Sequence, residues 1–329
     1  MAVIEPLPRT ALELPLKARF IVTGAVWEVS TNSEKILEIL RDAFQSSENN
    51  RSPAELEVFF HVDFALPAPI RQTFPHFRAL EHLYYGTFGS GDSMLVDQFN
   101  RRAVGSFSLA TVGDAGYWKR VILPCLLGIT SSCVGITPVH CACVERNQLG
   151  LLIHGESGTG KSTLALSLSL KGFSYVSDDC TYISHSGNRM RSWGSSAPLK
   201  LLPEAKAYFP LLANVVPSRS LNGELAFEVD PKEVFGIKRS VSCDPRWLFF
   251  IERTDEPTFD CLSISREESA VRLASDLEVL PPCIAAQREH QLAVIDTLVQ
   301  RECRLVRHGL QPEVLAMEIA NFCSFNQET

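Results

Sequence analysis

The spacing of hydrophobic residues in the first third of the chain predicts a mixed α/β region. Alternating apolar residues over 18–22 and 25–29 predict two strands, with Thr23 and Gly24 as a hairpin turn between them. Apolar residues recur at helical spacing over 34–44, which predicts a helix there. Further strands are predicted at residues 54–64, 83–88, 93–98 and 103–110.

In the rest of the chain, short apolar runs are interspersed with helical patterns. We predict strands at 149–153, 173–177, 246–252 and 303–307, and helices at 163–170, 267–277, 285–301 and 312–322. Polar and apolar residues alternate over 163–170 as in a strand, but the glycine-rich run before it favours a helix. The most apolar window, 121–137, contains Pro124 and four Ser or Thr residues, which indicates a buried helix rather than a membrane span.

Size and composition predict two domains of the α/β class. With 329 residues, of which 45% are hydrophobic, the chain can bury a sizeable core. We place an N-terminal α/β domain at 1–125, which would bind a partner or present a substrate, and a catalytic domain at 126–329. The net charge of −7, without a cluster of Lys and Arg, argues against a nucleic-acid-binding surface.

The cysteines and the N-terminus predict a cytoplasmic protein. The ten cysteines are scattered, without a Cys-x-x-Cys pair, and Cys141, Cys143, His140 and His154 fit no zinc spacing. Residues 1–17 have no basic segment followed by an apolar core, so no signal peptide is predicted. The expected state is therefore reduced thiols in the cytoplasm.

Residues 155–162 match Gly-x-x-x-x-Gly-Lys-Ser, the Walker A phosphate-binding loop of many nucleotide-binding proteins. The glycines lack a Cβ, so the backbone can turn with positive φ and direct its N–H groups inward, toward phosphate oxygens. The Lys side chain can reach the β- and γ-phosphates, and the Ser hydroxyl can bind Mg²⁺. The sequence thus predicts a nucleotide-binding site made by Gly155, Ser157, Gly158, Thr159, Gly160, Lys161, Ser162 and Thr163.

Two adjacent carboxylates, Asp178 and Asp179, follow the strand predicted over 173–177. Ligands of parallel α/β sheets bind at the carboxyl ends of the strands, so we expect this pair beside the phosphate-binding loop. One carboxylate can bind Mg²⁺, and the other can accept a proton from an attacking hydroxyl. Adjacent like charges raise the pKa of one partner, which suits a general base. The alternative is that the pair only caps a loop.

Residues 140–183 resemble the C-terminal catalytic domain of HPr kinase/phosphorylase and, more closely, its divergent bacterial relatives. The resemblance rests on His140 fifteen residues before Gly155, on the glycine-rich motif, on Lys171-Gly172-Phe173 and on Ser177-Asp178-Asp179. It implies an α/β P-loop kinase core of the HPr kinase/phosphoenolpyruvate carboxykinase type, joined to a separate α/β N-terminal domain.

The resemblance also implies Mg²⁺-dependent transfer of the γ-phosphate of ATP to a serine-type hydroxyl. In that reaction Lys161 would bind phosphate, Ser162 and Asp179 would bind Mg²⁺, and Asp178 would be the general base. His140 matches a histidine at the edge of the family's active site; alternatively, it closes a buried strand. The family also implies a homo-oligomer.

The sequence departs from the HPr kinases proper at two places. Thr163 replaces a Glu after the Lys-Ser pair, and residues 195–202 lack the Glu-x-Arg-Gly-x-Gly signature. The missing signature argues against HPr as the acceptor and against phosphorylase activity. Lys200, within that stretch, could add a positive charge near the phosphates, but a surface lysine is the preferred interpretation.

We therefore expect a kinase similar to the peptide-modifying kinases of biosynthetic gene clusters. A peptide or protein serine is the first choice of acceptor, and a small hydroxyl compound is the second. One alternative is a regulatory protein that binds a nucleotide without transferring phosphate. Another is a carboxykinase-like enzyme, but it needs a further Mn²⁺ site with His and Lys ligands, which the sequence does not supply.

Overall fold

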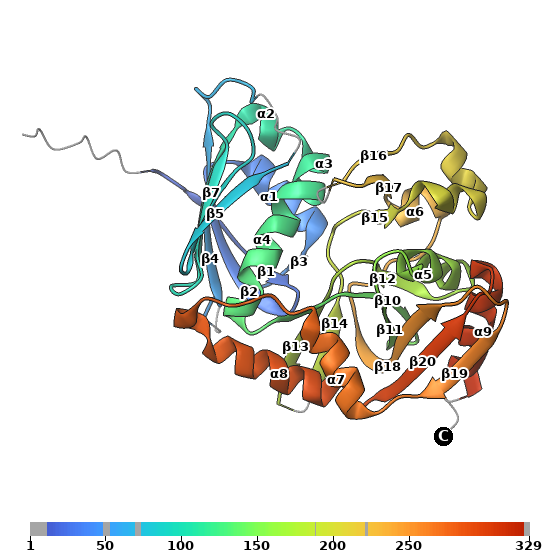
Figure 1. Ribbon diagram of the computed structural model, residues 1–329. Helices are drawn as coiled ribbons and strands as arrows, with labels where there is room; N and C mark the ends of the chain where they lie inside the picture. Colours follow the sequence, from blue (N-terminus) through green and yellow to red (C-terminus); the bar gives the residue numbers. More distant parts are fainter. Residues whose placement is uncertain (1–11, 49–52, 70–73, 188, 221–222, 326–329) are drawn as a thin grey trace, which may run out of the picture.

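The computed structural model describes residues 12–48, 53–69, 74–187, 189–220 and 223–325. Most of the N-terminal segment expected to lack a signal peptide lies outside the described residues. Two large sheets lie in separate halves of the molecule, with helices between them and below the second sheet (Figure 1). The mixed α/β class predicted from the sequence is confirmed.

Within the described residues the first sheet has the strand order β3-β1-β2-β4-β8-β7-β6-β5. The predicted hairpin is confirmed, since Val22 and Ala25 are paired across the turn. The strands of this sheet are β1 (Leu16–Val22), β2 (Ala25–Thr31), β3 (Gln45–Ser46), β4 (Leu56–Asp63), β5 (His76–Leu80), β6 (Leu83–Thr87), β7 (Ser93–Asp97) and β8 (Arg102–Ser108).

One face of the first sheet is covered by helices, which follow β2 and β8 in the chain (Figure 1). They are α1 (Glu34–Ala43), α2 (Leu109–Val112), α3 (Ala115–Tyr117), the π-helical turn η1 (Trp118–Ile122), α4 (Leu123–Thr130) and the 3-10 turn η2 (Ser132–Val134). Leu123, Leu126 and Leu127 are buried against this sheet, so the buried helix predicted in the most apolar window is confirmed. No helix in the described part of the chain is long and apolar enough to cross a membrane.

The core of the first sheet continues past residue 125 in the chain. Cys133, Val134 and Ile136 pack in the same hydrophobic cluster as the strands of this sheet. The division into domains 1–125 and 126–329 stays a prediction.

The second sheet has the order β12-β10-β11-β18-β14-β13-β9, with β20 also beside β18 and β19 beside β20. Its strands are β9 (Thr137–Val139), β10 (Cys141–Arg146), β11 (Leu149–His154), β12 (Ser174–Ser177), β13 (Thr181–Ser186), β14 (Arg189–Trp193), β18 (Ser242–Arg253), β19 (Phe259–Ser263) and β20 (Glu302–His308).

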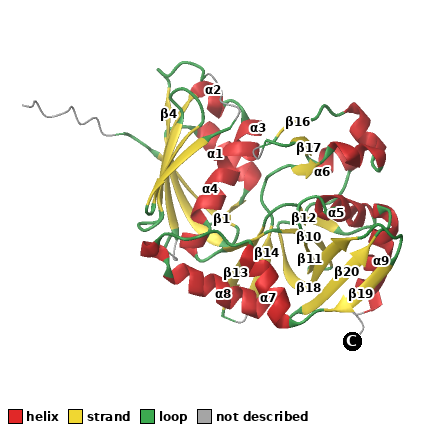
Figure 2. Cartoon of the chain, in the orientation of Figure 1, coloured by secondary structure: helices red, strands yellow, loops and turns green. Residues whose placement is uncertain are grey.

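Helices cover both faces of the second sheet (Figure 2). On one face, α5 (Lys161–Leu170) and α9 (Pro312–Phe325) bury apolar residues against the strands. On the other face the core includes α7 (Arg266–Ser275) and α8 (Ala286–Leu298). A helix over the alternating segment 163–170 is thus confirmed, because burial against a sheet and a neighbouring helix outweighs the period-2 pattern.

A small three-stranded sheet lies next to α5, on the side away from α7 and α8 (Figure 1). Leu166 of α5 and Tyr175 of β12 are buried in the core beneath it. This part contains β15 (Leu199–Leu201), η3 (Pro203–Ala207), η4 (Pro210–Asn214), β16 (Ser218–Arg219), β17 (Leu225–Val229) and α6 (Pro231–Phe235); a last short turn, η5 (Pro282–Ile284), precedes α8.

The direction of the strands differs from the parallel sheet expected from the sequence. β18 is parallel to β11, and β20 is parallel to β18, but β10 lies antiparallel between β11 and β12. Because β11 and β12 are both antiparallel to β10, they run in the same direction. The carboxyl ends of β11, β12, β18 and β20 therefore lie at one edge of a mixed sheet.

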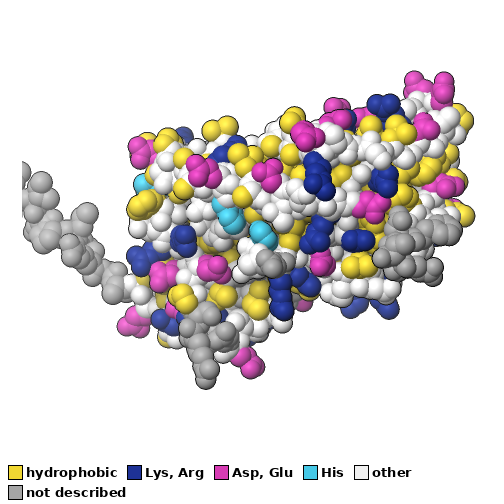
Figure 3. All heavy atoms as spheres, turned by 90° about the horizontal axis from the view of Figure 1, so that it is seen from below, with side chains coloured by type: hydrophobic (Ala, Val, Ile, Leu, Met, Phe, Trp, Pro, Cys, Tyr) yellow, Lys and Arg dark blue, Asp and Glu magenta, His cyan; other side chains and the backbone are white. Residues whose placement is uncertain are grey.

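On the face drawn in Figure 3, Lys and Arg side chains of the described residues lie among Asp and Glu and hydrophobic side chains.

Trp118 is one of the largest fully buried side chains of the first core. It is fully buried, and its ring centroid lies 5.3 Å from that of Phe60 and 4.9 Å from that of Phe107. We predict that Trp118→Ala lowers the free energy of unfolding by about 3–5 kcal/mol, because the substitution leaves a large cavity. Leu95→Ala, at a side chain 41% exposed, should change it by about 0.5 kcal/mol. Denaturant unfolding measures both; equal effects would contradict this prediction.

Candidate active site

The glycine-rich loop, residues 155–160, connects the end of β11 to the start of α5. Gly158 has φ +83° and Gly160 has φ +98°, a left-handed conformation that glycine adopts at little cost. A Cβ on Gly155 would lie 2.8 Å from the carbonyl oxygen of Ile251, so this glycine allows the loop to approach β18 closely. Gly160 precedes the first residue of α5, and the backbone N–H groups there lie at the positive end of the helix.

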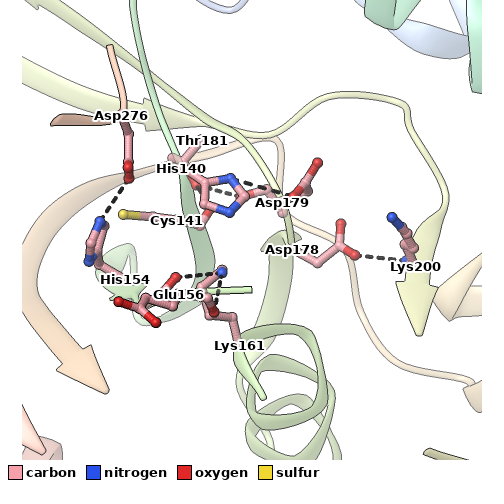
Figure 4. A network of polar contacts seen from close by, with 12 residues as sticks. His140, Cys141, His154, Glu156, Lys161, Asp178, Asp179, Thr181, Lys200 and Asp276 are labelled. Carbon is pink, nitrogen blue, oxygen red and sulfur yellow. Dashed lines mark hydrogen bonds and ion pairs between the residues drawn. The ribbon is translucent and has the colours of Figure 1, made fainter. Parts of the chain in front are cut away.

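The side chain of Lys161 is folded into this loop. Lys161 is only 7% exposed, and its Nζ donates hydrogen bonds to the carbonyl oxygens of Gly155 (2.6 Å) and Glu156 (3.1 Å) (Figure 4). Burial lowers the pKa of Lys161, while the carboxylate of Asp179 acts in the opposite direction. An anion bound at the loop would therefore favour the charged form of this lysine.

The two adjacent aspartates lie in different environments (Figure 4). Asp178 is 6% exposed; its Oδ1 accepts a hydrogen bond from the Tyr175 hydroxyl (2.9 Å), and its Oδ2 accepts one from the Lys200 backbone N–H (2.7 Å). Burial raises the pKa of Asp178 to about 7, with a further rise from the charge of Asp179 and opposing effects from the two hydrogen bonds. Burial, more than the neighbouring charge, is thus the main cause of the raised pKa of Asp178.

Asp179 and His140 face each other at the surface of the site. The Asp179 side chain is 72% exposed, and its Oδ1 lies 3.5 Å from Nδ1 of His140, whose side chain is 40% exposed. His140 lies between β9 and β10 at the edge of the second sheet. Its side chain is therefore directed toward the aspartate and not into a core.

A cavity of about 600 Å³ joins these elements. Its volume is in the usual range for small-molecule sites. Of the residues predicted from the sequence, the cavity is lined by His140, Ser157, Gly158, Thr159, Gly160, Lys161, Ser162, Thr163 and Asp179.

Two predicted residues do not line this cavity. Gly155 packs against β18, and Asp178 lies behind the wall, hydrogen-bonded to the backbone of Lys200. The side chain of Lys200 does line the cavity, where its Nζ lies 2.6 Å from a carboxylate oxygen of Glu224. The Lys200 side chain is 23% exposed, so both a surface lysine and a positive charge near the phosphates stay compatible with its position beside Asp178.

Three further residues near the loop were not predicted. His154, the last residue of β11, has its Nε2 2.8 Å from Oδ2 of Asp276 at the end of α7. Arg253 and His308, the last residues of β18 and β20, line the cavity. The available signal was that the predicted strands 246–252 and 303–307 end just before them.

Comparison with known proteins gives a match in the same part of the chain. Residues 134–200 match the family model of the HPr serine kinase C-terminal domain. Over 51 residues the chain is 47% identical to the HPr kinase/phosphorylase of Mycoplasmopsis pulmonis (strain UAB CTIP). Residues 134–200 are therefore similar to the C-terminal domain of the HPr kinases.

The predicted resemblance to this family is confirmed, and it covers a limited part of the molecule. The stretch shared with the Mycoplasmopsis protein is 16% of this chain and 16% of that one. The structure of the Hpr(Ser) kinase/phosphatase from Coxiella burnetii is similar at 12% identity, over 58% of this chain and 93% of that chain, with a TM-score of 0.32. A TM-score of this size does not establish a common fold.

The site offers few metal ligands of its own. The described residues contain no group of three or more His, Cys, Asp and Glu side chains that could hold a metal ion. Ser162 and Asp179 both line the cavity, and they supply one hydroxyl and one exposed carboxylate. This donor set fits Mg²⁺, which commonly takes one or two protein ligands together with water and substrate phosphates.

The buried Asp178 predicts a pH dependence of stability. Its pKa of about 7 lies above the ordinary aspartate value of 3.8, so the folded protein holds the proton more tightly than the unfolded chain. The stabilising contribution is complete below about pH 4 and is lost as the pH rises through about 7.

Denaturant unfolding at pH 5 and pH 8 tests this point. We predict that the wild type loses more free energy of unfolding between these pH values than Asp178→Asn does. Asp296→Asn, which changes an exposed carboxylate of α8 that does not line the cavity, is the matched control and should keep the wild-type difference. An identical pH dependence of the wild type and Asp178→Asn would contradict the prediction.

Proposed function

We propose that this protein is an ATP- and Mg²⁺-dependent kinase that transfers the γ-phosphate to a serine-type hydroxyl of a peptide, protein or small molecule. The observation that carries the proposal is the shared cavity. It is lined by the glycine-rich loop, the N-terminus of α5 and Asp179, and Asp178 lies directly behind its wall. The match of residues 134–200 to the HPr serine kinase C-terminal domain supports the same reaction class.

Phosphoryl transfer depends mainly on positioning and on neutralising charge, and the chain supplies groups for both. The backbone N–H groups of the loop and the ammonium of Lys161 would bind the phosphates. Mg²⁺ held by Ser162 and Asp179 would neutralise charge on the phosphate oxygens.

Asp178 would accept the proton of the acceptor hydroxyl. A pKa of about 7 is close to the optimum for a general base at neutral pH. Its Oδ1 and Oδ2 accept hydrogen bonds from Tyr175 and Lys200, so the acceptor hydroxyl must displace or join one of these donors.

The acceptor would enter between α5 and the small sheet. Lys200, Glu204, Tyr208 and Glu224 form the cavity wall on that side. Their mixed charge and one aromatic ring fit a peptide segment, which is our first choice, with a small hydroxyl compound as the second. Among acceptors we expect neither nucleic acid nor HPr.

The second candidate function is a regulator that binds ATP without transferring phosphate. One observation favours it: Asp178 does not line the cavity, and both its oxygens already accept hydrogen bonds. A transfer assay separates the two functions. Purified protein is incubated with Mg²⁺, γ-¹⁸O-labelled ATP, and lysate peptides and metabolites, and products are analysed by mass spectrometry. Labelled phosphate on a serine-containing product supports the kinase; ATP binding without any labelled product supports the regulator.

The role of Lys161 in binding phosphate gives the first functional prediction. We predict that Lys161→Met weakens ATP binding at least about tenfold, since one charge-assisted contact to phosphate is worth about 1.5–3 kcal/mol. Lys35→Met, at an exposed lysine of α1 paired with Glu38, is the control and should bind ATP as the wild type does. Isothermal titration measures both affinities. Unchanged ATP affinity of Lys161→Met would remove this lysine from the site.

The role of Asp178 gives the second functional prediction, in the pH profile of transfer. Because a general base works only when deprotonated, kcat/KM should rise tenfold per pH unit below about pH 7 and level off above it. Asp178→Asn should lower kcat at least about a hundredfold and abolish this rise. Asp179→Asn should instead raise the Mg²⁺ concentration needed for half-maximal rate. If Asp178→Asn keeps the wild-type rate and pH profile, another group is the base.

A further inference from the structure

Arg253 and His308 line the end of the cavity that lies away from the Asp pair. Neither side chain has a role in the phosphate transfer proposed above. Arg253 and His308 are register partners in the parallel strands β18 and β20. Ile251 and Val306, two residues earlier in each strand, are buried in the core below α5 and α9. Since alternate residues of a strand lie on one face, Arg253 and His308 continue that face to the edge where the glycine-rich loop lies.

Arg253 has an unused charge. Among the described residues its side chain makes no ion pair or hydrogen bond, whereas Lys161 donates to loop carbonyls and Lys200 pairs with Glu224. Arg253 lines the cavity close to the glycine-rich loop. His154, the residue before the loop, is paired with Phe250 of β18, and Arg253 follows Phe250 by three residues.

His308 has unsatisfied polar atoms. It is 5% exposed, and neither ring nitrogen makes a well-formed hydrogen bond within the described part of the chain. Burial lowers the pKa of His308, and the charge of Arg253 lowers it further, with a smaller opposing effect from the backbone of Leu310. At neutral pH the ring is therefore uncharged, with one donor and one acceptor nitrogen. Such a ring suits hydroxyl or heterocycle partners better than it suits phosphate.

The remaining wall at this end is apolar. It consists of Leu310 and of Pro312 and Leu315 at the start of α9. An apolar wall with one planar cation and one neutral imidazole is the composition expected for a heterocyclic base and a sugar, because a guanidinium can stack on an aromatic ring.

The residues at the two ends of the cavity also determine how a bound nucleotide would be oriented. The transferred phosphate must lie where Lys161 meets Asp179, and the phosphates occupy the loop between that point and Arg253. The nucleoside therefore extends toward β18, β20 and α9, and the opposite side, toward Lys200 and Tyr208, is left for the acceptor.

We propose that Arg253 and His308, with the apolar start of α9, form the nucleoside subsite of this cavity and hold the base and ribose of a purine nucleotide. This inference rests on the proposed function, since it requires phosphates at the glycine-rich loop. It assigns Arg253 and His308 to binding of the nucleoside and not of the phosphate chain.

The test compares two probes, ATP and inorganic tripolyphosphate, each with Mg²⁺, by isothermal titration to the full chain. Arg253→Met and His308→Phe keep much of the side-chain volume and remove the polar contacts. Each should weaken ATP binding about tenfold, equivalent to about 1.4 kcal/mol. Each should leave tripolyphosphate binding unchanged, which also shows that the variant is folded. Lys161→Met should weaken both probes.

Arg307→Met is the matched control, because Arg307 lies on the other face of β20 and pairs with Glu252. It should leave both affinities unchanged. Equal loss of ATP and tripolyphosphate in Arg253→Met would make Arg253 a phosphate ligand and overturn the inference. Unchanged ATP affinity in both Arg253→Met and His308→Phe would overturn it as well. A wild-type protein that binds neither probe would refute the proposed function itself.

Discussion

The crossover from β11 through α5 to β12 determines where the parts of the candidate site meet. β10 lies between these two strands and is antiparallel to both, so β11 and β12 run in the same direction and end at the same edge of the sheet. The glycine-rich loop leaves β11 at that edge, and the Asp pair leaves β12 there. Only one helix and one strand separate the two motifs in the sequence. This short connection can place them at the same edge because α5 has to cross only one strand, β10, to reach β12.

The site contains two ionisable groups of opposite charge, Lys161 and Asp178, whose burial disfavours their charged forms. Burial lowers the pKa of Lys161 and raises that of Asp178, so each group is shifted toward its neutral form. A phosphate next to Lys161 would favour its charged form, because attraction between opposite charges is strong where water is excluded. Asp178 has the complementary property, since it holds a proton readily near neutral pH. The same burial thus prepares one residue to bind an anion and the other to accept a proton.

The loop conformation could be predicted from the sequence, but the wall of the cavity could not. Glycines at fixed spacing encode the left-handed turns at Gly158 and Gly160, since few other residues adopt them. The burial of Asp178 depends on the backbone of Lys200, which belongs to a different sheet. Local periodicity carries no information on that contact. β10 was missed for a local reason: its charged end, Glu145 and Arg146, weakens the apolar pattern although Glu145 is buried.

Arg253 and His308 show how a sheet assembles a site from distant parts of the chain. Each is the last residue of a strand predicted with nearly correct bounds, yet the sequence does not specify that β18 lies between β11 and β20. That order alone brings an arginine and a histidine beside the glycine-rich loop. Gly155 makes the approach possible, because any side chain there would collide with the Ile251 carbonyl of β18. Because the first glycine of the motif has no side chain, the loop can pack directly against the strand that carries Arg253.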